Sequence, residues 1–93
     1  MLRITVQYAD AHITLKLEGT LAGPWVEELE RSWKTLAYTA PGKPIRADLT
    51  DVGFIAPEGR ILISRMVHAG VEMIASGCMV QAIVDEAVKS QRP

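Results

Sequence analysis

The sequence predicts a small α/β protein of one domain, and three observations support this prediction. At the N-terminus, apolar and polar residues alternate, which is typical of a strand with one buried face. Further along, short apolar runs alternate with segments of helical spacing, which favours parallel strands joined by crossover helices. The chain has 93 residues, 48% of them hydrophobic, and this size and composition suit a single packed domain.

The first two elements are predicted to form a β-hairpin. In residues 2–8, apolar side chains occupy every second position: Leu2, Ile4, Val6 and Tyr8. A second strand follows in "HITLKLEG", residues 12–19, with Ile13, Leu15 and Leu17 pointing inward. The segment "ADA" between these strands is short enough for a hairpin turn.

The first helix is predicted to begin at Pro24, after the stretch "GTLAGP" breaks the strand pattern. Proline suits the first turn of a helix because its missing N–H would have no partner there. Four apolar residues then recur at helical spacing and predict a core stripe: Trp25, Leu29, Trp33 and Leu36. On the other face, the spacing predicts two i,i+4 ion pairs, Glu27 with Arg31 and Glu30 with Lys34.

The second half of the chain is predicted to alternate strand and helix. The turn "TAPGKP" leads into a strand over residues 45–49, and this strand is predicted to break at residues 51–53. A helix follows over residues 57–69. "GVEMIAS" predicts a fourth strand, and Ser76 is a favourable N-cap for a last helix. The predicted architecture is therefore a mixed sheet of about four strands covered by about three helices.

Charge and cysteine content indicate a soluble cytoplasmic protein without a nucleic-acid partner. Ten basic residues nearly balance eleven acidic ones, so no strong field attracts phosphates or an anionic membrane. The single cysteine, Cys78, has no partner for an internal disulfide. The N-terminus lacks the pattern of a signal peptide, and no apolar run approaches the roughly 18 residues of a membrane span.

Three blocks of the chain give it a resemblance to a known family. They are "LKLEGTLAG", "RADLTDVGFIAPEGRILI" and "VEMIASGCMVQAIVDEA". Together they resemble the STAS domain of bacterial anti-sigma factor antagonists and of sulfate-transporter cytoplasmic tails. The middle block is the most specific, because Asp48-Leu49, Phe54-Ile55 and Gly59 match the family pattern. The resemblance implies a STAS-like α/β fold and a protein partner, either an ATP-binding anti-sigma kinase or a transporter subunit.

The chain departs from the family at the position that the resemblance makes most informative. Where the family has Asp and a phosphorylatable Ser or Thr, this chain has Ala56 and Pro57, followed by Glu58. Proline has no hydroxyl, so no phosphoacceptor exists at this position. Glu58 instead places a permanent negative charge in the first turn of the helix, where the helix dipole favours it. Pro57-Glu58 is also a favourable helix start without any function, and both interpretations stay open.

Other residues that carry chemistry do not combine into a catalytic or metal site in the sequence. Asp48, Asp51 and Glu58 surround one loop, but a hard cation needs more oxygen ligands than three acids supply. His12 and His68 lie far apart in the predicted structure, and neither has a ligand or nucleophile at a recognisable spacing. No cofactor, metal or enzymatic activity is therefore predicted.

The sequence thus predicts a non-catalytic regulatory module that binds a protein. The predicted contact surface lies at the loop after the third strand and the start of the second helix, where the apolar residues are too many for one core-facing stripe. Its predicted residues are Thr20, Asp51, Ala56, Pro57, Glu58, Gly59, Arg60, Ile61 and Ile63. A homodimer through the same surface and a small-ligand or lipid-binding, transport-accessory role are the alternatives.

Overall fold

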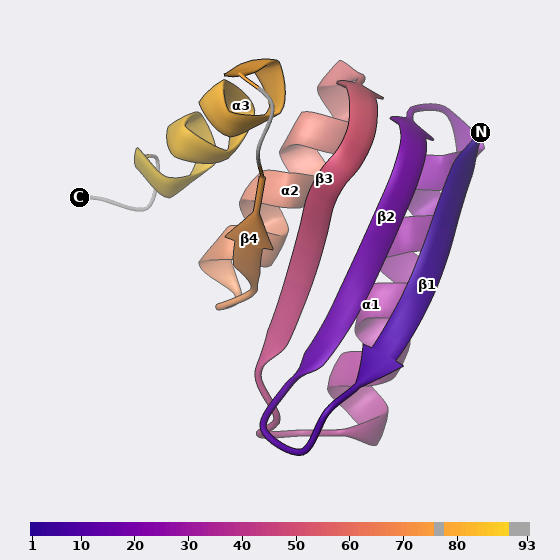
Figure 1. Ribbon diagram of the computed structural model, residues 1–93, viewed down its shortest axis with the longest axis vertical. Coiled ribbons are helices and arrows are strands. Elements are labelled where there is room, and N and C mark those ends of the chain that lie inside the picture. The colour runs from indigo at the N-terminus through magenta and orange to yellow at the C-terminus, as the bar shows by residue number, and fades with distance from the viewer. Residues whose placement is uncertain (76–77, 90–93) are drawn as a thin grey trace.

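The computed structural model describes residues 1–75 and 78–89 (Figure 1). The chain begins with two strands, and helices then alternate with strands to the end. The elements are β1 (Leu2–Tyr8), β2 (Ile13–Leu21), α1 (Pro24–Thr39), β3 (Ile45–Ile55), α2 (Pro57–His68), β4 (Glu72–Ile74) and α3 (Cys78–Lys89). The predicted order of strands and helices is therefore confirmed. Ser76, the predicted cap of the last helix, lies outside the described residues.

The four strands form one mixed sheet in the order β1-β2-β3-β4. β1 and β2 are the antiparallel arms of the hairpin. β2 pairs parallel with β3, and β3 pairs parallel with β4. This topology agrees with the predicted hairpin followed by parallel strands, and it brings the C-terminal ends of β2 and β3 to the same edge of the sheet.

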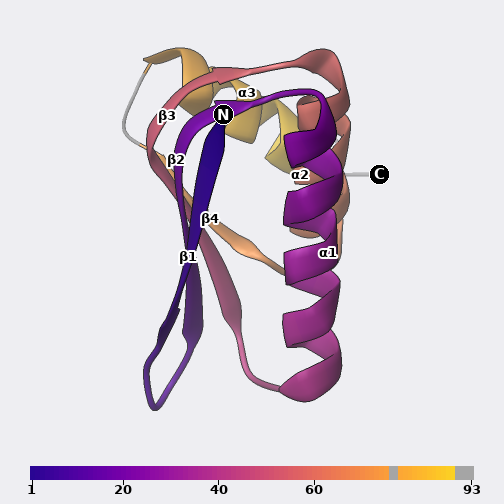
Figure 2. The ribbon, with the colours of Figure 1, turned by 90° about the vertical axis from the view of Figure 1, so that its right-hand side faces the viewer.

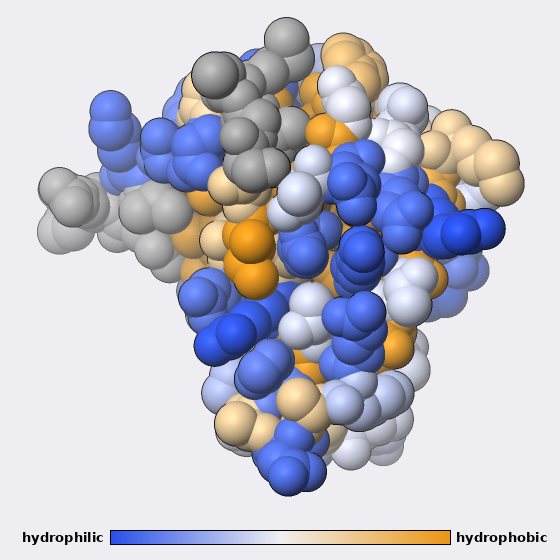
Figure 3. Space-filling model, viewed as in Figure 1, coloured by the Kyte–Doolittle hydropathy of each residue, from blue (hydrophilic) through white to orange (hydrophobic). Residues whose placement is uncertain are grey.

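The hydrophobic core lies between the sheet and the helices. Figure 2 shows α1 and α2 on the same side of the sheet, while α3 contacts α2 and β3. The largest side chains that are less than 2% exposed come from both layers: Ile13, Leu15, Leu17, Leu21, Leu29, Leu49, Ile55, Leu62, Ile63 and Met66. The opposite face of the sheet is mainly hydrophilic (Figure 3). Because only one face of the sheet meets a helical layer, strands with alternating residues suffice to build the core.

β3 differs from its prediction because it continues to Ile55 and does not break at residues 51–53. Its pairing with β2 shifts twice, between Lys16 and Glu18 and between Gly19 and Thr20, and β3 carries an extra residue at each shift. Such bulges bend and twist a strand without ending it. The polar residues that predicted a break are therefore accommodated inside a longer strand.

Ion pairs on α1 agree with the prediction in part. Glu30 accepts Lys34 across 2.8 Å, as the i,i+4 spacing predicted. Arg31, however, pairs with Glu28 at i,i+3 across 3.0 Å, and not with the predicted partner Glu27. Both spacings place side chains on one helix face, so the sequence alone does not separate them.

In the described part of the chain, no helix is long and apolar enough to cross a membrane.

Candidate partner-binding surface

The start of α2 is held against the ends of β2 and β3 by backbone contacts. The Ala56 N–H donates to the Leu21 carbonyl oxygen across 2.9 Å, directly after β3 ends. The Arg60 N–H then donates to the Ala56 oxygen across 3.0 Å and closes the first turn of the helix. Ala56 makes no side-chain cap, and Pro57 occupies the first turn, where its missing N–H has no cost.

Gly59 allows this helix start to lie close to the sheet. A Cβ atom at Gly59 would lie 3.0 Å from Leu21 Cγ and from Ile55 Cγ2, and 3.1 Å from the Leu21 oxygen. A side chain at this position would force its neighbours to shift by a few tenths of an ångström. Gly59 matched the family pattern in the sequence, and the structure supplies a physical reason for a glycine at this place.

Glu58 joins the starts of the two long helices. Its Oε1 accepts a hydrogen bond from the backbone N–H of Gly23, which is the residue before α1, across 3.3 Å. The carboxylate also lies in the first turn of α2. One negative charge therefore stands near two helix N-termini, where unpaired N–H groups favour an anion. The sequence did not indicate Gly23 because its contribution is a backbone N–H.

Two large apolar side chains are exposed within a few residues of Glu58 in the sequence. Phe54 is 49% exposed near the end of β3, and Ile61 is 64% exposed in the second turn of α2. Pro57 and Arg60 are also exposed. We call Phe54, Pro57, Glu58, Arg60 and Ile61 the α2 start surface. Exposed apolar groups beside charged ones are the composition expected of a protein-binding surface.

Three residues predicted for this surface are buried and are corrected here. Ile63 is 1% exposed and Ala56 is 6% exposed, and Gly59 is also buried. α2 turns Leu62 and Ile63 toward the core and leaves Ile61 outside, so the excess apolar residue is Ile61 alone. Adjacent helical positions are 100° apart, and the helix therefore buries two consecutive residues but excludes the third.

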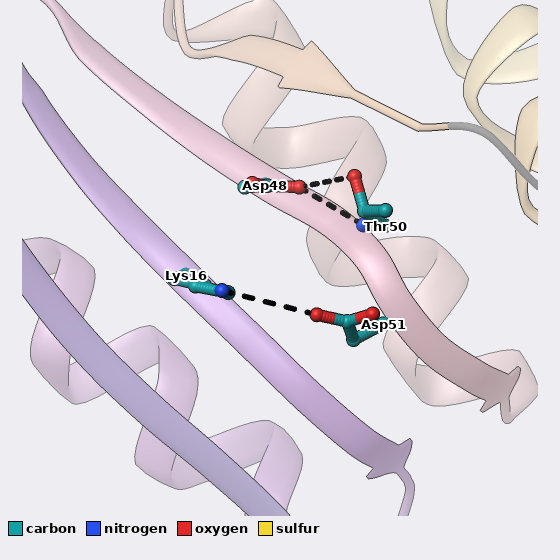
Figure 4. Close-up of polar contacts among 4 residues, drawn as sticks. All are labelled: Lys16, Asp48, Thr50 and Asp51. Carbon is teal, nitrogen blue, oxygen red and sulfur yellow. Dashed lines mark hydrogen bonds and ion pairs between the residues drawn. The ribbon is translucent and has the colours of Figure 1, made fainter.

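Two other predicted residues lie on β2 and β3. Thr20 is partly exposed near the end of β2, where it pairs in register with Phe54. Asp51 is exposed on β3, and its Oδ2 lies 3.9 Å from Lys16 Nζ (Figure 4). Thr20 therefore adjoins Phe54 directly, whereas Asp51 is held by a neighbouring strand. Phe54 was inside the predicted segment but was not singled out, because its apolar character also fits a core position.

The Asp48 carboxylate is hydrogen-bonded to Thr50 within β3. Its Oδ1 accepts from the Thr50 hydroxyl across 2.6 Å and from the Thr50 N–H across 3.0 Å (Figure 4). The hydroxyl bond, followed by the backbone bond, lowers the pKa of Asp48 below its ordinary value. These bonds lie where the β2–β3 register shifts, so this carboxylate stabilises the bulge.

Within residues 1–75 and 78–89, no three His, Cys, Asp or Glu side chains form a group that would hold a metal ion.

A shallow groove between α1 and α2 continues from Ile61. It has a volume of about 600 Å³ and is lined by Trp33, Ile61, Ser64, Arg65, His68 and Ala69. The Glu30 carboxylate on α1 accepts hydrogen bonds from Arg65 Nη2 on α2 and from Lys34 Nζ, each across 2.8 Å. These hydrogen bonds, to Lys34 first and then to Arg65, lower the pKa of Glu30. The sequence did not predict this groove, because it joins residues of two helices far apart in the chain.

Comparison with solved structures identifies the fold. An anti-sigma factor antagonist from Mycobacterium paratuberculosis superposes with a TM-score of 0.73 at 15% identity, over 100% of this chain and 96% of that one. An uncharacterised protein from Shewanella loihica, described as having a SpoIIAA-like fold, gives 0.59 at 12% identity, over 96% of this chain and 78% of that one. The protein therefore has a STAS-like α/β fold.

Other comparisons add little to this fold assignment. A protein named Mglu matches with a TM-score of 0.61 at 22% identity, over 78% of this chain but only 19% of that protein. No protein-family model matches the chain, and no curated protein matches significantly. The fold resemblance stated from the sequence motifs is confirmed by three-dimensional similarity, at identities too low to identify the function.

Proposed function

We propose that this protein is a non-catalytic regulatory module of the bacterial cytoplasm that acts by binding a protein partner through the α2 start surface. The observation that carries the proposal is the exposure of Phe54, just before α2 in the chain, and of Ile61, in its second turn, at 49% and 64%. Burial of two such side chains against a partner would contribute several kcal/mol. Glu58 and Arg60 beside them supply charges of both signs for orientation.

The proposed surface differs from a phosphorylation switch because its charge is permanent. Pro57 has no hydroxyl, and Glu58 already occupies the helix start with its carboxylate bonded to Gly23. A phosphoryl group would change the local charge by about −1.5 to −2, whereas this carboxylate contributes one constant negative charge. Intact mass measurement of protein from its native cell should show no phosphate, and a phosphothreonine at Thr50 would contradict the fixed state.

Two classes of partner fit the fold and the surface. One is an ATP-binding anti-sigma kinase, supported by the similarity to an anti-sigma factor antagonist. The other is a cytoplasmic subunit of a membrane transporter, which the STAS resemblance implies. Both would contact the α2 start surface, so the same variants test both.

The α1–α2 groove favours a macromolecular partner over a small apolar ligand or lipid. The groove is shallow and opens to solvent, whereas sites for small apolar ligands enclose most of the ligand. Native mass spectrometry of the purified protein should therefore show the mass of the chain without added lipid. An added mass that survives purification would favour the alternative role as a ligand-binding or transport-accessory module.

The proposal is tested with Ile61→Asp and Arg60→Glu. Both positions are exposed, so the variants should fold as the wild type does, and circular dichroism checks this. Immobilised wild-type protein should capture a protein of one of the two classes, whose purified form is then titrated by calorimetry. We expect both variants to weaken this binding by about tenfold or more. Ile61→Asp would bury an unpaired charge in the interface, and Arg60→Glu would reverse a charge.

A matched control is Tyr38→Asp, which replaces another exposed hydrophobic residue by an acid. Tyr38 is 87% exposed at the far end of α1 from the α2 start surface. It should therefore leave the affinity unchanged. Full binding by both test variants, or an equal loss in the control, would show that the partner does not bind at the α2 start surface.

A further inference from the structure

β1 is an exposed edge strand of the sheet, and the exposed edge along it is called the β1 margin. It pairs with β2 on one side, and none of residues 1–75 and 78–89 adds a strand on its other side (Figure 1). β1 runs for seven residues in continuous register with β2, without a bulge, and it contains no proline or lysine. Natural sheets protect exposed margins with such features, or with a covering segment. Among the described residues this strand is therefore unprotected, and it is open to pairing with a strand of another chain.

The hydrogen-bond pattern of the hairpin shows which backbone groups point outward. The Thr20 N–H donates to the Met1 oxygen across 2.8 Å, and the Ala9 N–H donates to the His12 oxygen across 3.0 Å. Because bonded positions alternate along an antiparallel pair, Arg3, Thr5 and Gln7 direct their backbone groups to β2. The groups of the intervening residues, Leu2, Ile4, Val6 and Tyr8, therefore face away from the sheet.

The side chains of β1 suit an apolar contact along one face of this margin. Ile4 and Val6 are half-buried against the core, and Tyr8 is 72% exposed. Arg3 is the one charged residue of the strand. The margin therefore combines unpaired backbone groups with incompletely covered apolar side chains, and it carries little charge to repel another strand.

We propose that a second copy of this chain pairs with β1, antiparallel and about a two-fold axis through Thr5. In this register, Ile4 opposes Val6 of the second copy, and Leu2 opposes Tyr8. All four outward-facing residues then donate and accept a bond, which no other antiparallel register of the two strands achieves. The two sheets become one continuous sheet.

A second copy is favoured because β1 is complementary to itself. The proposed register places apolar residues opposite apolar residues on the helix-facing side. On the other face it places Arg3 opposite Gln7, so that no like charges meet. The formal net charge of the chain is only −1, and two copies repel each other weakly. The proposed contact lies on a different side of the molecule from α2 (Figure 1), so it leaves the α2 start surface free.

The register is tested by charge substitutions at Thr5, whose side chain is exposed. Sedimentation and light scattering should show that the wild-type full chain is a dimer at micromolar concentration. Thr5→Lys and Thr5→Glu each place like charges directly opposite at the axis, and each should raise the dimer dissociation constant. Mixing the two variants should restore a dimer with one chain of each kind, which native mass spectrometry identifies by mass.

Thr14→Lys is the matched control, because Thr14 is on β2 opposite Gln7 and is therefore one strand away from the margin. This control should dimerise as the wild type does, and circular dichroism checks that all variants fold. A wild-type monomer throughout the concentration range would overturn the proposal. Unchanged dimers in both Thr5 variants, or failure of the mixture to form the mixed dimer, would also overturn it.

Discussion

The Glu58 carboxylate lies 3.3 Å from the backbone nitrogen of Gly23 and accepts its hydrogen bond, so a side chain at the start of α2 bridges to the residue before α1. The two residues are separated by 35 positions in the sequence. Because Glu58 stays exposed, this bridge orders the carboxylate without removing it from contact with a partner. The relationship explains how one acid can serve both the fold and the proposed function.

Glu58→Gln should separate these two roles. An amide oxygen can still accept from Gly23, but the negative charge at the helix start is lost. We expect the free energy of unfolding to fall by about 0.3–1 kcal/mol. The free energy of binding to the partner should change by more than this amount. Urea denaturation and calorimetric titration measure the two effects. Glu28→Gln is the control for removal of a charge, because Glu28 is an exposed residue of α1. If the two variants bind the partner with the same affinity, Glu58 has no role in binding.

Gly59→Ala should destabilise the protein, because the added methyl group meets Leu21 and Ile55 at about 3.0–3.1 Å. Overpacking of this kind costs about 1–3 kcal/mol, which exceeds the gain of about 1 kcal/mol in helix propensity. Thermal and urea denaturation should show the loss. Gly53→Ala is a matched control, since a Cβ atom there meets nothing within 4 Å, and its effect should stay within about 0.5 kcal/mol. Equal stability of the two variants would contradict the close approach of α2 to the sheet.

Asp48 should contribute stability that depends on pH. Its pKa in the folded protein lies below the ordinary 3.8, chiefly because the Thr50 hydroxyl and N–H donate to its carboxylate. A lowered pKa means that the charged form stabilises the fold above the unfolded pKa, and that this contribution is lost as the pH falls through the folded pKa. At neutral pH, Asp48→Asn should cost about 0.5–1 kcal/mol after solvent screening.

The check is urea denaturation of the wild type and Asp48→Asn from neutral pH down to about pH 2. The difference in unfolding free energy should shrink on acidification, in the window below the ordinary aspartate pKa. Asp51→Asn provides a comparison, because Asp51 contacts Lys16 at 3.9 Å and is exposed. A difference between the wild type and Asp48→Asn that stays constant with pH would show that charge plays no part at this bulge.

Local sequence patterns were sufficient to predict the elements of the fold. The alternation in β1 and β2 predicted the hairpin, and the helical spacing of Leu29 and Leu36 predicted which face of α1 is buried. The extent of β3 was not predictable in the same way. Its polar residues, including Thr50, are characteristic of turns, but pairing with β2 and the bonds to Asp48 keep them in the strand. Tertiary pairing therefore overrode the local preference.

The sequence predicted a candidate surface at the start of α2, but it did not show which of the residues there are exposed. The excess of apolar residues on α2 indicated that some were exposed, yet only the packing of α2 showed that Ile63 is buried and Ile61 is not. The groove with Trp33 and the contact from Gly23 to Glu58 required two helices to be placed side by side. No local signal marks such contacts, because their partners are separated along the chain.

By itself, the sequence determined the order of elements, the mixed sheet and the permanent charge at Glu58, since apolar period, turn residues and the absence of a hydroxyl at Pro57 are local properties. The tertiary structure decided which apolar residues face the core, how far β3 extends and which strand margin stays open. These features depend on pairing and packing between distant segments, whose free energy exceeds the preferences of single residues.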